Sequence, residues 1–302
     1  MESWPLSHFI RRLALHGVIL VREFGMTRRL LPAFSPRRID FEQSPEDIQA
    51  SATMTIIVAI HDAPEVTRRC LASLEKYAPE SEIILVDDAS RLSDTLEAIR
   101  DFSTRNNWKV IRHEKSLGHS EACREGATLA TRPYLCLLNS DTVVTPWCWR
   151  LVNEAFEQDQ KIGIAGPSTS CIGGLQTLRW STFLSSSWDD NQICSFAKDL
   201  LTRCREPVVK DVPCVTGFAF FIRRSLWEQV GGFDRNLSDY GNEIELCFRI
   251  AEEGYRTVWV RNSYIHHFGR QTYRRTIGVK GIHERMRTAE NYIRQKRRSW
   301  VT

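Results

Sequence analysis

Strand-like apolar runs alternate with helical segments between residues 54 and 138, and this alternation restricts the fold more than any other feature of the chain. The runs lie at residues 54–60, 82–86, 109–112 and 134–138. Segments of helical periodicity lie between them at 65–77, 94–104 and 117–130. Short apolar runs without polar alternation are typical of strands buried on both faces of a parallel sheet. The order therefore predicts an α/β fold whose parallel strands are joined by right-handed crossovers.

The composition is that of an ordinary globular protein, and none of its apolar stretches approaches the length needed to cross a bilayer. The first residues have no apolar core and cleavage site of a secretory signal. The nine cysteines are scattered and form no C-x-x-C pair, so we expect reduced thiols rather than disulfides or a zinc site. A cytoplasmic location follows from these expectations.

Positive charge is concentrated at the two ends of the chain. The excess of basic over acidic residues there is larger than the net charge of +4, so the middle of the chain is acidic. We expect a basic amphipathic extension at residues 1–50, a main domain at 51–275 and a basic helical tail at 276–302, with a polar linker near 44–53. The basic ends can rest on an anionic membrane surface, at the inner face of the plasma membrane, or can be solvated helix faces. No nucleic-acid-binding motif accompanies the charge, so no nucleic-acid partner is expected.

Acidic side chains follow three of the expected strands. Asp62 comes after the first strand, Asp87 and Asp88 after the second, and Asp141 after the strand at 134–138. Each alone is typical of a turn or a helix cap, but the carboxyl ends of parallel strands meet at one edge of a sheet. No glycine-rich turn follows the first strand, which excludes a dinucleotide fingerprint and a P-loop. Together the acids suggest a site for a base or ribose plus a cation.

The second half of the chain is less regular. Residues 168–190 show no clear period, as in a binding loop or a partly disordered segment. A strand is expected at 214–222 and a helix at 226–230. A further helix begins with Glu243 and Glu245, and the helix dipole would be a sufficient reason for either acid.

The order of these pieces resembles the family 2 glycosyltransferases with the GT-A fold, from about Thr53 to about Tyr273. The nearest likeness is to the bacterial branch that builds O-antigen and capsule, including rhamnosyltransferase-like members. The resemblance implies a mostly parallel central sheet flanked by helices. The motifs that carry it are Asp87-Asp88-Ala89-Ser90, Leu138-Asn139-Ser140-Asp141, Thr216-Gly217, Gly231-Gly232-Phe233-Asp234, Asn242-Glu243-Ile244-Glu245-Leu246 and His266-His267.

The resemblance also implies roles for individual residues. Asp88 would contact the nucleotide base, beside a wall formed by Ala59, His61 and Asp62. The donor-binding set is completed by Asp87 and Ser140. Asp141, the last residue of a D-x-D-like motif, and His267 would hold Mn²⁺ or Mg²⁺. Glu243 stands at the position of the general base, and Glu245 is the acid that follows it in the family pattern.

These roles describe an inverting transfer of a sugar from a UDP-, dTDP- or GDP-sugar to a glycan or lipid-linked glycan acceptor. The alternative is a noncatalytic nucleotide- or carbohydrate-binding module on the same fold. Nucleotidyl transfer is disfavoured because the first strand lacks the glycine-rich, basic loop of such enzymes. Asn139 and Asn242 depart from the usual acids of the family motifs.

Overall fold

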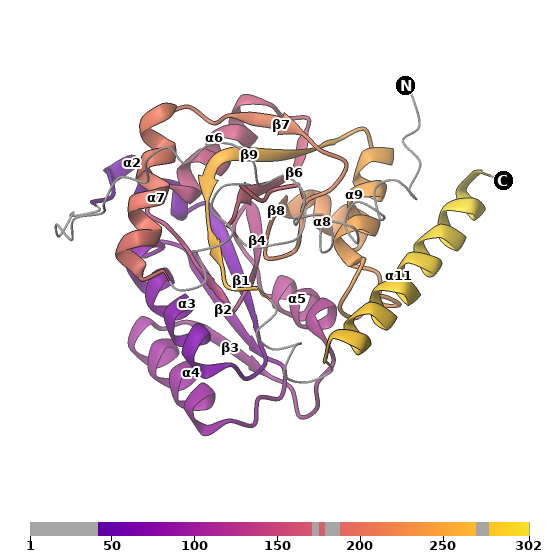
Figure 1. Cartoon of the computed structure of the whole chain (residues 1–302), viewed down its shortest axis with the longest axis horizontal. Coiled ribbons are helices and arrows are strands. Elements are labelled where there is room, and N and C mark those ends of the chain that lie inside the picture. The colour runs from indigo at the N-terminus through magenta and orange to yellow at the C-terminus, as the bar shows by residue number, and fades with distance from the viewer. Residues whose placement is uncertain (1–41, 171–174, 179–187, 270–277, 302) are drawn as a thin grey trace, which may run out of the picture.

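The computed structural model describes residues 42–170, 175–178, 188–269 and 278–301. Most of the extension expected at 1–50, and with it the expected membrane contact of that end, lies outside these residues, as does much of the irregular segment 168–190. The described residues form three layers, in which helices cover both faces of an eight-stranded sheet (Figure 1). The strand order is β3-β2-β1-β4-β8-β6-β9-β7.

The first half of the sheet is the parallel arrangement that the sequence predicts. It consists of β1 (Met54–Ile60), β2 (Glu82–Asp87), β3 (Lys109–Arg112) and β4 (Tyr134–Asn139), and β1 pairs in parallel with both β2 and β4. Ile57 of β1 lies between Ile84 and Leu137 in the ladder, and all three are fully buried. Apolar side chains thus point to both faces of this half, which explains the absence of polar alternation. The α/β fold class, with a mostly parallel sheet, is confirmed.

The second half of the sheet is mixed. β6 (Ile162–Ser168) and β9 (Arg256–Tyr264) are parallel, whereas β8 (Ala219–Arg223) lies antiparallel between β4 and β6, and β7 (Val209–Asp211) is antiparallel to β9. The expected strand at 214–222 was wrong in its first part, because residues 214–218 form a loop. Thr216 donates its N–H and its hydroxyl to the side chain of Gln176, at 2.6 and 2.7 Å, instead of joining a ladder.

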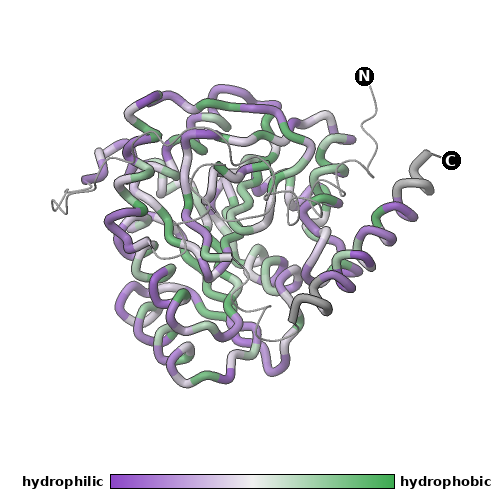
Figure 2. Tube along the Cα trace, in the orientation of Figure 1, coloured by the Kyte–Doolittle hydropathy of each residue, from purple (hydrophilic) through white to green (hydrophobic). Residues whose placement is uncertain are grey.

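The helices sort by the face of the sheet that they cover. One face carries α3 (Pro64–Tyr77), α4 (Ser93–Asn106), α6 (Cys148–Gln158) and α7 (Asp190–Arg203), and the other carries α5 (His119–Thr128), α8 (Arg224–Val230) and α9 (Asn242–Glu252). Figure 2 shows the central strands largely apolar and polar stretches concentrated on the surrounding helices. Among the helices described here, none is both long and apolar enough to cross a membrane.

The segment expected as a polar linker is mostly helix. Ser44 caps α2 (Pro45–Ser51) in a capping box, in which its hydroxyl accepts from Asp47 N–H and the Asp47 side chain accepts from Ser44 N–H. Asp47 also pairs with Arg150 of α6 at 2.8 Å, and its side chain is almost fully buried. Helix α2 is therefore packed on the domain and does not act as a spacer.

Helix α11 (Gly278–Val301) occupies the segment expected as a helical tail, and it lies alongside the domain (Figure 1). Ala289 and Ile293 are buried against Leu237, in a small apolar cluster separate from the two main cores. This end of the chain is therefore part of the folded structure.

Helix α5 is held to the sheet at Gly126, where a Cβ would lie 2.4 Å from a methyl of Ile57 and 3.1 Å from one of Val86. We predict that Gly126→Ala destabilises the protein by about 1–3 kcal/mol through overpacking, although Ala favours helix. Urea unfolding measures the loss. The exposed Thr128→Ala change in the next turn is the control, and an equal loss there would contradict the close approach.

Candidate active site

The two residues expected to hold a metal lie next to each other beyond the end of β4. His267 Nε2 is 3.1 Å from Asp141 Oδ1. The backbone fixes this pair, because β5 (Thr142–Val143) and β10 (His266–His267) form a short antiparallel ladder and Phe268 N–H donates to Asp141 C=O at 2.9 Å. The His267 ring also stacks on Phe218 at 5.2 Å. Residues 126 positions apart in sequence are thus held together by secondary structure.

The donor set of this pair fits a divalent cation. Asp141 and His267 are only 10 and 15% exposed in their side chains, so the pair is sheltered but open to a ligand. Among the described residues, His, Cys, Asp and Glu form no cluster of three or more that would hold a metal unaided. A cation here would take its remaining ligands from water and ligand oxygens, as Mg²⁺ commonly does, and the imidazole would favour Mn²⁺.

Glu243 lies in the first turn of α9 and is partly buried. Its carboxylate rests against Gly217, where a Cβ would come within 2.1 Å of Glu243 Oε1. Burial raises the pKa of Glu243 to about 7, although the backbone N–H groups of Glu243 and Gly217 oppose the rise. A carboxyl group with a pKa near neutrality is suited to proton transfer.

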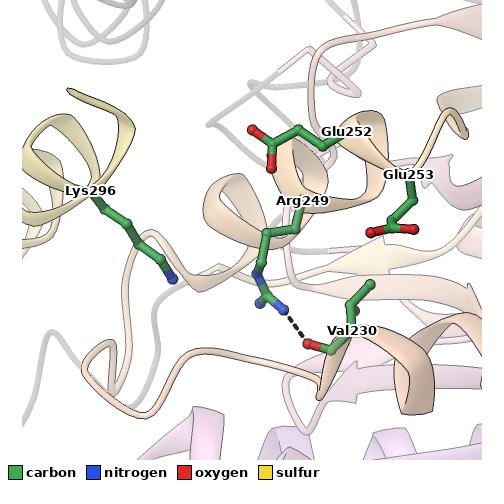
Figure 3. Close-up of a pocket in the computed structure, with 5 residues that line it drawn as sticks. All are labelled: Val230, Arg249, Glu252, Glu253 and Lys296. Atoms are coloured by element: carbon green, nitrogen blue, oxygen red, sulfur yellow. Dashed lines mark hydrogen bonds between the residues drawn. The ribbon is translucent and has the colours of Figure 1, made fainter. Parts of the chain in front are cut away.

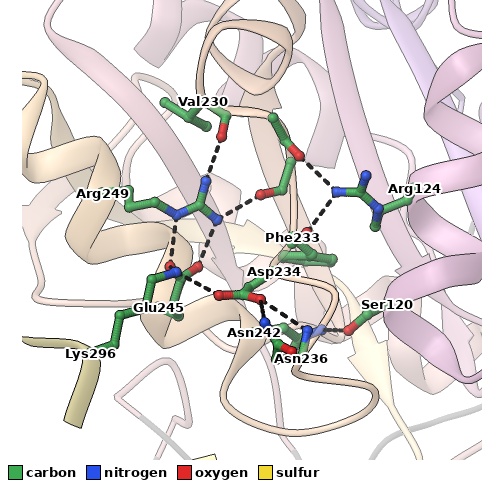
Figure 4. Close-up of polar contacts among 12 residues, drawn as sticks. Ser120, Arg124, Val230, Phe233, Asp234, Asn236, Asn242, Glu245, Arg249 and Lys296 are labelled. Carbon is green, nitrogen blue, oxygen red and sulfur yellow. Dashed lines mark hydrogen bonds and ion pairs between the residues drawn. The ribbon is translucent and has the colours of Figure 1, made fainter. Parts of the chain in front are cut away.

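Glu245 has different surroundings. It is fully buried, and its oxygens accept from Arg249 Nε at 2.8 Å, from Arg249 Nη2 at 2.6 Å and from Lys296 at 2.6 Å (Figure 4). These contacts make it the centre of an ion-pair network between α9 and α11. The expectation that Glu245 is catalytic gains no support from them.

Asp88 is buried and organises the loop that leads into α5. Its oxygens accept from Ser116 Oγ at 2.6 Å and from the N–H groups of Leu117 and Gly118 at 2.7 and 3.0 Å. His113 bridges Asp88 and Glu125 at 2.7 and 2.8 Å. Burial alone would raise the pKa of Asp88, but these hydrogen bonds lower it. Asp88 therefore shapes the edge of the site, and its contact with a nucleotide base stays a prediction.

The other residues expected to bind the donor also lie at this edge. Asp62 Oδ1 accepts from the N–H groups of Arg91 and Leu92 at 2.8 and 2.9 Å, which closes the turn after β2. His61 Nδ1 lies 2.6 Å from Asp88 C=O. Asp87 pairs with Arg112 and accepts from Ser90 N–H, Ala59 is opposite Asn139 in the ladder, and Ser140 is buried. The structure brings these residues together without testing their roles.

His119 was missed from the sequence. It is the first residue of α5, it hydrogen-bonds the Asn139 side chain, and the charges of Asp141 and Asp239 act on its ring. Burial lowers the pKa of His119 against the effect of these acids. The sequence shows only that this histidine stands at the start of a helix. Its position near Asp141 depends on tertiary structure, which the sequence pattern does not show.

Comparison with known proteins identifies the family. Residues 55–231 match the model for "Glycosyl transferase family 2", which covers more than half of the chain. The chain belongs to glycosyl transferase family 2. The match includes Asp88, Asp141 and Gly217 but ends before Glu243 and His267.

Curated proteins share this region at modest identity. An inactive polypeptide N-acetylgalactosaminyltransferase-like protein 5 of Macaca fascicularis is 26% identical over 260 residues, which are 80% of this chain and 56% of that protein. A poly-β-1,6-N-acetyl-D-glucosamine synthase of Staphylococcus epidermidis is 27% identical over 43% of this chain and 33% of its own length. A pre-mycofactocin glycosyltransferase of Mycobacterium tuberculosis is 25% identical over 76% of this chain and 46% of its own length. The family 2 chain thus spans about half or less of these relatives.

Solved structures support the GT-A fold. GalNAc-T7 with UDP, GalNAc and Mn²⁺ superposes with a TM-score of 0.55 at 20% identity, over 71% of this chain and 43% of that one. The mannosyltransferase PcManGT of Pyrobaculum calidifontis, with GDP-Man and Mn²⁺, gives 0.54 at 15% identity, over 74% of this chain and 59% of that one.

The raised pKa of Glu243 makes a prediction about stability. Between the ordinary glutamate pKa of 4.5 and the folded-state pKa of about 7, the native state retains a proton that the unfolded chain releases. The stability of the wild type therefore falls as pH rises through this interval. Glu243→Gln avoids this loss. We expect the variant to gain up to roughly 3 kcal/mol on the wild type above pH 7, and little at pH 4.

Chemical unfolding at a series of pH values measures this difference. Glu252→Gln replaces an exposed acid of the same helix and is the matched control. A pH-independent difference between Glu243→Gln and the wild type would show that the carboxyl group is not desolvated.

Proposed function

We propose that this family 2 protein is an inverting glycosyltransferase that moves a sugar from a nucleotide-diphosphate donor to a glycan or lipid-linked glycan acceptor. The observation that carries the proposal is the loop at Gly217 and Phe218. Gly217 contacts the carboxylate of Glu243, and the next residue, Phe218, stacks on His267, which lies beside Asp141. One short loop thus joins the candidate base to the candidate metal ligands.

Asp141 and His267 would hold a divalent cation in this proposal. Such a cation, when bound, would supply positive charge that stabilises the departing nucleoside diphosphate. Asp88 and its neighbours His61 and Asp62 shape the edge where the base and ribose bind. The two structural neighbours were crystallised with UDP or GDP-Man and Mn²⁺, which supports a nucleotide donor and this choice of metal.

Glu243 acts as the general base. Its carboxylate accepts the proton of an acceptor hydroxyl, and the resulting oxygen attacks the anomeric carbon from the face opposite the leaving group. A single displacement of this kind inverts the anomeric configuration. Gly217 fixes the carboxylate on one side, since a larger residue there would collide with it.

The acceptor class rests on the relatives. The poly-β-1,6-N-acetyl-D-glucosamine synthase and a mouse hyaluronan synthase 3, which is 22% identical over 78% of this chain, are named for glycan polymers. In more detail, we propose that the protein belongs to the bacterial, rhamnosyltransferase-like branch and acts in the synthesis of a cell-surface polysaccharide. In this proposal it works at the cytoplasmic face of the plasma membrane, with its basic ends in contact with anionic lipid.

The alternative is a noncatalytic binding module that keeps the fold. One relative that matches most of this chain is named inactive, which is the observation that favours this alternative. The two functions differ in what Glu243 does, so variants of this residue separate them.

Asp141→Asn should abolish metal-dependent donor binding and leave the fold intact, because it removes the only carboxylate of the proposed ligand pair. The measurement is thermal unfolding with UDP, dTDP or GDP, each with and without Mn²⁺. A nucleotide at a hundred times its dissociation constant stabilises the wild type by about 2.7 kcal/mol. Asp199→Asn, an exposed acid of α7, is the control. A Mn²⁺-dependent shift that survives in Asp141→Asn would refute the metal assignment.

Glu243→Gln should abolish transfer while donor binding persists. In the wild type, kcat/KM should rise about tenfold per pH unit below the Glu243 pKa of about 7 and level off above it, because the deprotonated carboxyl group is the active form. Initial rates of donor consumption with acceptor present measure both effects. Unchanged function in Glu243→Gln would instead favour the binding module.

A further inference from the structure

Helix α11 packs against the loop that leads to Glu243, which comprises residues 234–241. Gly241 ends this loop with φ +82°, and a Cβ there would lie 3.0 Å from both Ala289 and Ile293 of α11. Leu237 of the loop is buried by the same two side chains. The loop thus accepts α11 at close range because residue 241 has no side chain.

Ion pairs from Lys296 and Arg285 of α11 strengthen this contact. Lys296 donates to Asp234, where the loop begins, at 2.5 Å, and to Glu245 of α9 at 2.6 Å (Figure 4). Tyr292 donates to Asp234 at 2.8 Å, and Arg285 pairs with Asp239. The loop is therefore joined to α11 near both of its ends, and its far end continues directly into the first turn of α9.

The loop also contacts the start of α5. Ser120 N–H donates to Ser238 C=O at 2.8 Å, and Asn242 Nδ2 donates to Ser120 Oγ at 2.8 Å. His119 N–H lies 3.4 Å from Asp239 Oδ1. The loop is thus held between α11 and the start of α5, and Glu243 follows it directly in the chain.

Figure 3 shows Lys296 reaching from α11 toward α9 at the margin of a hollow of about 280 Å³ lined by Val230, Arg249, Glu252 and Glu253. Arg249 donates to Glu245 and to Val230 C=O, and Lys296 is engaged as described above. The two cationic side chains that line this hollow, Arg249 and Lys296, are therefore both paired with groups of the protein. We interpret the hollow as the gap between α9 and α11 that Lys296 spans, and not as a ligand site.

We propose that Lys296 is a positioning residue, through which α11 holds the 234–241 loop and the first turn of α9 in the arrangement that sets Glu243 against Gly217. The kinetic part of this inference rests on the proposed function. If Lys296 contributed only to global stability, its loss would leave the pKa of Glu243 and the kcat of the folded protein unchanged. A positioning role and a purely stabilising role can therefore be separated.

The first test compares Lys296→Met with Arg294→Met in the full chain. Arg294 is on the same helix and pairs with Glu290 within α11, so the control removes the same charge without touching the loop. We expect Lys296→Met to lower kcat by about tenfold to a hundredfold, as for a displaced catalytic group, with the donor KM unchanged. Lys296→Arg should recover part of the loss. Equal kcat values in Lys296→Met and the control, or a change in donor KM alone, would overturn the inference.

The second test needs no turnover, so it separates this inference from the proposed function. The free energy of unfolding is measured at a series of pH values for four proteins: the wild type, Glu243→Gln, Lys296→Met and the double variant. The effect of Glu243→Gln is then compared with and without Lys296. This effect levels off above the folded-state pKa of Glu243. Release of the loop should admit water to Glu243 and move the pH of this levelling-off from about 7 toward the ordinary pKa of glutamate. Tyr292→Phe, which loses the hydroxyl contact to Asp234 and keeps the ring, should move it less in the same direction. A levelling-off that stays at about pH 7 in the Lys296→Met background would overturn the inference even if transfer is observed.

Discussion

The contact between Gly217 and the carboxylate of Glu243 is the constraint on which the candidate site depends. A side chain at residue 217 would occupy the space that Glu243 uses, so the absence of a Cβ permits the acid to sit against the backbone. That enclosure removes water from the carboxyl group and raises its pKa to about 7. Phe218 stacks on His267, so the same backbone segment also contacts the Asp141–His267 pair. A shift of this loop would disturb both contacts together.

Most acids at the carboxyl edge of the sheet first serve the backbone of their own turns. Asp62 accepts from two backbone N–H groups beyond β2, and Asp88 accepts from two at the start of α5. These carboxylates are engaged by backbone N–H groups, so they shape the edge whether or not they also touch a ligand. Asp141 differs because its carboxylate lies beside the imidazole of His267. Acids that look equivalent in the sequence therefore have different partners in the structure: backbone N–H groups for Asp62 and Asp88, and an imidazole for Asp141.

Periodicity predicted the elements that are stabilised locally, and it failed where tertiary contacts decide. The strands β1 to β4 are visible in the sequence as short apolar runs, and the helices between them as apolar residues at helical spacing. β8 begins later than expected because Thr216 hydrogen-bonds the side chain of Gln176, which is 40 positions away in the sequence, instead of joining the sheet. α7 and β9 were not predicted. For the site, motif order indicated Asp141, His267 and Glu243, but it could not show that Lys296 neutralises Glu245 or that His119 approaches Asp141.

The distribution of charge along the chain has a structural cause at its carboxyl end. Arg285 and Lys296 belong to the basic tail, and their partners Asp239, Asp234 and Glu245 belong to the acidic middle. Glu245 is fully buried, so an unpaired charge there would carry a large desolvation cost, which Arg249 and Lys296 offset from two helices. Part of the basic charge is thus required by the domain itself, and it is not available to a membrane surface. The matched family region ends at residue 231, so the parts that complete the site, α9, β10 and α11, all lie beyond it. The ion pairs of Lys296 with Asp234 and Glu245 join α11 to the 234–241 loop and to the helix that carries Glu243.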